Sequence, residues 1–180
     1  KEKGHSTENI SVAVVDSGFD KGRVNQAKRR DIHFQKYYSH KRQQNSTIDP
    51  FGHGTHVLSV IAGKDGVGIA PDSPTKVFTV LDENNEGNRA DTLEDLARAC
   101  RDGNKIINLS IGFSRKRDPN FSEEVLGPFS KMLKKRGCYV FKSSGNNGHK
   151  YDPKDKNLKF SNVIEVGSNH MSLTEGWYSD

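Results

Sequence analysis

Two histidines three positions apart stand in the stretch DPFGHGTHVLSVIAG, residues 49–63. Two zinc ligands on one helix are normally four residues apart, as in HExxH. Only Gly and Thr separate His53 from His56, and no acidic residue is placed to be a third ligand. The spacing therefore disfavours zinc. It favours His53 at a helix start, where Gly52 and Gly54 let the backbone pass close to a partner and the neutral imidazole accepts a proton from a nucleophile.

Asp16 is a candidate for the carboxylate that would hold the other ring nitrogen of such a base. It ends the apolar run of VAVVDSGFD, residues 12–20. A carboxylate at the mouth of a buried strand is costly unless it is paired or hydrogen-bonded. Pairing with His53 would satisfy it. Capping of the following turn through neighbouring N–H groups would satisfy it as well, so the residues alone leave both interpretations open.

Two further motifs stand where predicted strands end. INLSIG, residues 107–112, is either a plain core strand or an edge whose backbone groups pair with an extended peptide. SSGNNG, residues 143–148, is either a tight turn or a segment that aims the side-chain amide of Asn146 at a developing oxyanion. Each of these motifs is a weak signal alone.

The elements that must position these residues alternate along the chain. Short apolar, β-branched runs predict five strands, Ile10–Val15, Lys76–Leu81, Lys105–Ile111, Cys138–Ser143 and Asn162–Val166. Helical patterns predict three helices, Gly54–Gly63, Thr92–Arg101 and Ser122–Arg136. This alternation indicates an α/β domain with a mainly parallel sheet and helices on both faces. The polar segments 17–50 and 146–161 are expected to be surface loops.

Length and charge narrow the class of protein. A chain of 180 residues suits one domain with a hydrophobic core. The net charge of +5 permits nucleic-acid binding, but the basic clusters are short, separate and interrupted by acidic residues, which favours solvated surface. No stretch approaches the roughly 18 apolar residues of a membrane span. Cys100 and Cys138 form no CxxC motif, and either a disulfide or two buried thiols fit them.

Five motifs in order resemble one family. VDSG, HGTHV, GVGIAP, NLSIG and SSGNNG are similar to segments of the subtilisin-like serine proteases, and the resemblance runs from about residue 10 to residue 170. It implies a subtilisin-like three-layer sandwich with a central, mainly parallel sheet, incomplete in this chain. It also implies a single peptidase domain over residues 1–180, which lacks the segment that would carry the nucleophilic serine.

The resemblance implies roles for individual residues. Asp16 would be the acid that orients the histidine, His53 the general base, and Asn146 the side-chain donor to the oxyanion, whereas His56 would be structural. Two short segments would line opposite walls of the substrate cleft: Ser110, Ile111 and Gly112 on one side, and Ser143, Ser144 and Gly145 on the other. No residue is assigned to a metal.

The nucleophile is the main departure from the family pattern. Subtilases carry their serine in a Gly-Thr-Ser segment that opens a long apolar helix, and the chain contains no such segment. Ser179 has neither a preceding Gly-Thr nor a following helix. One explanation places the serine on a segment or second chain outside these 180 residues. The alternative is a pseudoprotease that binds a peptide or partner protein in the cleft. Retention of Asp16, His53 and Asn146 favours the first.

The resemblance also indicates what the protein would work with. We expect a polypeptide substrate, an inhibitory propeptide as a further partner, no nucleic acid and no required cofactor. Many subtilases insert a calcium-binding loop after the helix that bears the histidine, and AGKDGVGIAP, residues 62–71, contains no such insertion. Most members of the family are secreted, so we expect a secreted protein, with an intracellular location as the alternative.

Overall fold

The computed structural model describes residues 6–22, 48–63, 66–112, 125–145 and 161–168 of the chain, together with the backbone of 34–39. The chain divides into two compact units, Lys1–Asn108 and Leu109–Asp180, and each is described by itself.

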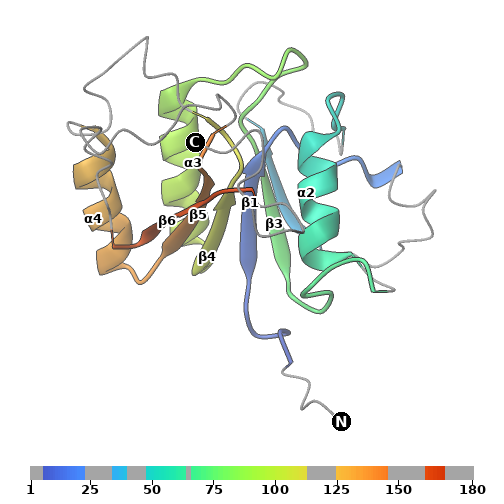
Figure 1. Cartoon of the computed structure of the whole chain (residues 1–180), viewed down its shortest axis with the longest axis horizontal. Helices are drawn as coiled ribbons and strands as arrows, with labels where there is room; N and C mark the ends of the chain where they lie inside the picture. Colours follow the sequence, from blue (N-terminus) through green and yellow to red (C-terminus); the bar gives the residue numbers. More distant parts are fainter. Residues whose placement is uncertain are drawn as a thin grey trace. The chain divides into compact units, whose positions relative to one another are not determined.

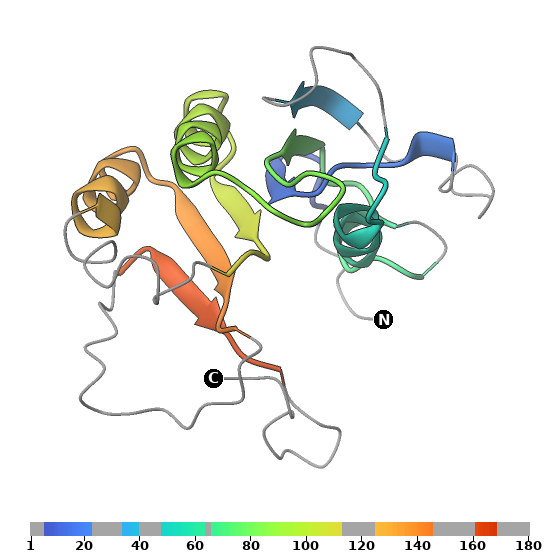
Figure 2. The same ribbon diagram turned by 90° about the horizontal axis from the view of Figure 1, so that it is seen from above.

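Four strands form the sheet of the first unit, in the order β2-β3-β1-β4. They are β1 (Val12–Asp16), β2 (Phe34–Ser39), β3 (Thr75–Thr79) and β4 (Ile106–Leu109). β3 pairs in parallel with β1 on one side and with β2 on the other. Helices α2 (His53–Ala62) and α3 (Arg89–Arg101) lie on opposite sides of β1 and β3 (Figures 1 and 2).

This double cover explains the sequence of β1. All five of its residues are buried, so a continuous apolar run replaces the alternation of a strand with one face in water. Val14 of β1 and Val77 of β3 pack with Leu58 of α2 and with Phe19 in one buried cluster. The cluster fixes α2 against the strands. Asp16 is the last residue of β1, so it lies at the carboxyl edge of the sheet, where ligands of open parallel sheets bind.

The second unit contains α4 (Gly127–Lys135) and the parallel pair β5 (Tyr139–Ser143) and β6 (Val163–Val166). Leu133 of α4 is buried, as is Val140 of β5. The side-chain amide of Asn162 is also buried and donates to the carbonyl oxygens of Ser130 and Cys138, 3.1 and 3.2 Å away. A buried polar group is therefore satisfied where the helix, β5 and β6 come together.

The predicted α/β class with a parallel sheet is confirmed, and each of the five predicted strands and three predicted helices has a counterpart. α3 begins three residues before its predicted start at Thr92, and α4 begins at Gly127, whereas the first predicted residues of that helix, 122–124, lie outside the described residues.

One prediction is wrong: segment 17–50 is not simply a surface loop. It contains β2, and its residues Ser17, Phe19 and Asp49 are buried. The segment FQKYYS contains polar residues, so it lacks the apolar run by which the other strands were predicted. Its aromatic residues nevertheless favour a strand, and a strand at the edge of a sheet needs no apolar run.

Two smaller observations bear on the sequence interpretation. Neither Cys100 nor Cys138 is a free thiol. No helix within the described ranges has the length and apolar character needed to cross a membrane.

Candidate active site

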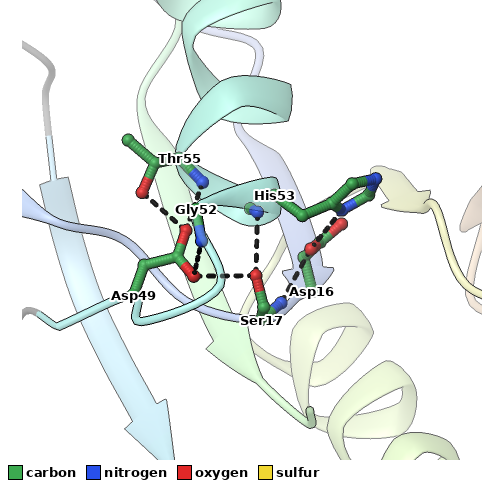
Figure 3. A network of polar contacts seen from close by, with 7 residues as sticks. Asp16, Ser17, Asp49, Gly52, His53 and Thr55 are labelled. Carbon is green, nitrogen blue, oxygen red and sulfur yellow. Dashed lines mark hydrogen bonds and ion pairs between the residues drawn. The ribbon is translucent and has the colours of Figure 1, made fainter. Parts of the chain in front are cut away.

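The structure brings Asp16 and His53 together. Asp16 ends β1 and His53 begins α2, and the Nδ1 atom of the imidazole lies 2.7 Å from Oδ1 of the carboxylate (Figure 3). The side chain of Asp16 is fully buried, whereas that of His53 is 40% exposed. The carboxylate is therefore shielded from water while the imidazole that it holds stays reachable from outside.

This contact sets the chemistry of the ring. An ionised carboxylate only accepts hydrogen bonds, so the Nδ1 atom of His53 carries the proton that it donates to Asp16. The Nε2 atom of the neutral ring then has a free lone pair. A histidine held in this tautomer can take a proton from a hydroxyl and later return it to a leaving group.

The electrostatics of the pair favour the protonated imidazole. The hydrogen bond with Asp16 raises the pKa of His53 above its ordinary value of 6.5, and partial burial opposes this rise. The negative charges of Asp16 and Asp49 raise the pKa of His53 further. A positive charge that appears on His53 during proton transfer is thus stabilised by two carboxylates.

Glycines allow this close approach. A methyl group on Gly54 would overlap the carbonyl oxygen of Gly18 and would lie 2.9 Å from its nitrogen and 3.2 Å from the Cβ atom of Asp16. Gly52, which precedes α2, has φ 84°, a conformation that L side chains rarely adopt. The Gly-His-Gly sequence therefore lets the first turn of α2 rest directly on the turn that follows β1. The expected close approach of the backbone is confirmed for Gly54, and Gly52 contributes the left-handed conformation at the helix start.

A second buried carboxylate lies beside the pair, and sequence reasoning gave it no role. Asp49 is fully buried and accepts hydrogen bonds from Ser17, Gly52 and Thr55 (Figure 3). The only local sequence feature at Asp49 is the motif Asp-Pro-x-Gly, which is typical of a turn before α2. The contact with Ser17, 32 positions earlier, cannot be read from spacing.

The other predicted site residues lie in the second unit or outside the described residues. Ser110, Ile111 and Gly112 directly follow β4, and the first two are half-buried. Ser143 ends β5, the amide of Ser144 donates to the carbonyl oxygen of Val166, and Gly145 has φ 128°. Asn146 and Ser179 are not among the described residues.

His56 is one turn along α2 from His53, and its side chain is exposed. Within the described ranges, no three histidine, cysteine, aspartate or glutamate side chains gather as a metal site would require.

Comparison with known proteins identifies the class that this fold and this pair define. The sequence pattern of the subtilase family, Peptidase_S8, matches residues 7–172, so the chain belongs to the subtilase family. The fold is accordingly the subtilisin-like α/β sandwich that the motifs implied.

Particular relatives are similar over most of the chain. The minor extracellular protease Epr of Bacillus subtilis (strain 168) is 27% identical over 169 residues, which cover 92% of this chain and 24% of Epr. Subtilisin E of the same organism is 26% identical over 183 residues, 98% of this chain and 45% of subtilisin E. The crystal structure of a lanthipeptide protease superposes with a TM-score of 0.78 at 26% identity, covering 97% of this chain and 53% of that one. The chain thus spans half or less of the length of Epr and subtilisin E.

Proposed function

We propose that the protein is a serine endopeptidase in which this chain supplies the acid, Asp16, and the general base, His53. The observation that carries the proposal is the 2.7 Å contact between a fully buried carboxylate and a partly exposed imidazole. Because the imidazole is 40% exposed, a substrate can reach it while the buried carboxylate holds it, as a general base requires. Membership in the subtilase family supports the same reading.

The nucleophile would be a serine on a segment outside these 180 residues. The Nε2 atom of His53 takes the proton of its hydroxyl as the oxygen attacks the scissile carbonyl carbon. Asp16 stabilises the resulting imidazolium. Asn146 and a backbone N–H group hold the oxyanion of the tetrahedral intermediate. His53 then donates the proton to the leaving amine, which departs as the C–N bond breaks and leaves an acyl-enzyme for water to hydrolyse.

The substrate would be an extended polypeptide that pairs with the backbone of Ser110, Ile111 and Gly112 and faces Ser143, Ser144 and Gly145 on the other side. An inhibitory propeptide would fit the same cleft. Secretion is the location we propose, supported by similarity to two relatives described as extracellular proteases.

The test is labelling of the protein, expressed with its complete natural sequence, by a fluorophosphonate probe, followed by mass spectrometry to locate the label. We expect one labelled serine outside residues 1–180, and no label in the His53→Ala variant, which lacks the base. Absence of label on folded wild-type protein would overturn the proposal and favour a pseudoprotease. Peptide binding without cleavage would then be the activity to measure.

A further inference from the structure

We propose that Asp49 is a positioning residue for His53: it fixes the first turn of α2 and, through Ser17, ties that turn to the end of β1. The inference rests on the proposed function, since it assigns Asp49 to the support of the proposed general base. Within the described part of the chain, the donors to Asp49 are Ser17, directly after β1, and Gly52 and Thr55, at the start of α2.

Asp49 accepts four hydrogen bonds. Its Oδ1 atom accepts from the hydroxyl of Ser17 and from the amide of Gly52, both at 2.9 Å. Its Oδ2 atom accepts from the amide and the hydroxyl of Thr55, at 2.8 and 2.6 Å. These four donors compensate for the burial of the charge, because a buried carboxylate without them would be strongly destabilising.

The start of α2 has no capping group of its own. The N-cap residue, Gly52, has no side chain to cap the helix, and the first turn contains no acidic residue. Asp49 performs both tasks from outside the helix: it accepts from the amides of Gly52 and Thr55 and places a negative charge at the positive end of the helix dipole. The residue that begins this turn is His53.

Ser17 links Asp49 to Asp16. The hydroxyl of Ser17 donates to Asp49 and accepts from the amide of Gly54 at 2.9 Å. The amide of Ser17 donates to the Oδ1 atom of Asp16 at 2.7 Å, the same oxygen that holds His53. Asp49, Ser17, Asp16 and His53 therefore form one continuous series of hydrogen bonds (Figure 3). Displacement of Asp49 would move both partners of the pair.

Charge supports the geometry. Burial raises the pKa of Asp49, but the hydrogen bonds from Thr55, Gly52 and Ser17 lower it by more, so its pKa lies below the ordinary value and the group is ionised at neutral pH. Asp49, from the segment before α2, therefore joins Asp16 of β1 in raising the pKa of His53.

The experiment replaces Asp49 by Asn in the protein with its complete natural sequence. Asn keeps the shape and one acceptor but loses the charge and one acceptor oxygen. We expect kcat to fall by about 10²-fold with KM nearly unchanged, because a displaced base affects the chemical step. In histidine-labelled protein, the NMR titration of His53 should shift to lower pH, and the Nδ1 proton signal should broaden. Asp95→Asn, which also removes a fully buried carboxylate but on α3, is the matched control and should change neither.

A folded Asp49→Asn variant with wild-type kcat and an unchanged His53 titration would overturn the proposal. If that variant does not fold, Ser17→Ala decides, since it cuts the link but leaves the other three donors on Asp49. We expect a several-fold loss of kcat there, and no loss would overturn the proposal. The NMR titration needs no turnover. Failure of this inference is therefore distinguishable from failure of the proposed function, which would appear as wild-type protein that takes up no fluorophosphonate.

Discussion

The starts of α2 and α3 are built in opposite ways. α3 uses signals from its own sequence: Asn88 caps it by accepting from the amide of Ala90 at 2.8 Å, Asp91 stands in its first turn, and Arg98 and Arg101 stand in its last. α2 has a glycine before it, no acid in its first turn and no base in its last. The amides of Gly52 and Thr55 instead donate to Asp49, in the segment just before the helix, and the amide of Gly54 donates to Ser17, which directly follows β1.

α3 contributes only to the fold, whereas α2 also positions the side chain of His53. The cap of α3 fixes that helix against its own preceding residue, whereas the contact with Ser17 fixes α2 against the end of β1, where Asp16 lies. Local rules are broken where a site demands another arrangement. Four predictions test this contrast.

The largest expected effect is on turnover. Asp16→Asn keeps the shape of the side chain but removes the charge and the acceptor that holds Nδ1 of His53 in its tautomer. We expect kcat of the complete protein to fall by about 10⁴-fold. Steady-state kinetics on a peptide substrate measures this. Asn88→Ala, at the start of α3, is the control and should retain full activity. A loss below tenfold would mean that Asp16 only caps its turn.

A substitution at the contact between α2 and β1 should have the next largest effect. Gly54→Ala forces the helix away from the backbone of Gly18, and we expect a loss of about 1–3 kcal/mol in the free energy of unfolding. Urea denaturation measures it. Gly112→Ala is the matched stability control, because a methyl group there meets nothing within 4 Å. Equal unfolding midpoints for the two variants would contradict the close contact.

Removal of the cap of α3 should lower the free energy of unfolding by less and should leave catalytic activity unchanged. Asn88→Ala removes the acceptor for the amide of Ala90, and we expect a loss of about 1 kcal/mol in the free energy of unfolding. The same urea titration serves. If Asn88→Ala reduced kcat as well, the division between a helix of the fold and a helix of the site would be wrong.

The smallest effect is the dependence of stability on pH. The folded pKa of His53 is raised, so its contribution to stability is fully present below 6.5 and is lost as pH rises through the folded value. Unfolding of wild type and of His53→Ala, compared from about pH 5 to pH 9, should show their difference shrink as pH rises. A difference that grows with pH would contradict the pairing. Activity should rise over the same range, because only the neutral imidazole accepts a proton.

Sequence reasoning located the elements whose residues carry their own signals. The buried run before Asp16 and the Gly-His-Gly motif predicted the end of β1 and the start of α2 within a residue or two. The cap at Asn88 was available but unused, since the helix prediction relied on apolar periodicity from Leu93 onward. β2 was missed because its polar residues conceal a strand in a sheet.

The support of the site could not be predicted in the same way. Asp49 stands in the quoted histidine motif, yet its role depends on Ser17, which lies 32 positions away. Such a contact exists only once β1 and α2 are packed. The residues that carry the proposed chemistry have a recognisable motif, whereas the residues that hold them have ordinary turn signals.

The amides of Gly54 and Thr55 end on a hydroxyl and a carboxylate that are themselves buried. First-turn amides have no acceptor within their helix and usually exchange their hydrogens with water without any opening of the structure. Here we expect exchange to require release of the turn from Ser17 and Asp49. The amides of Gly54 and Thr55, next to a partly exposed imidazole, should therefore exchange more slowly than first-turn amides that face water.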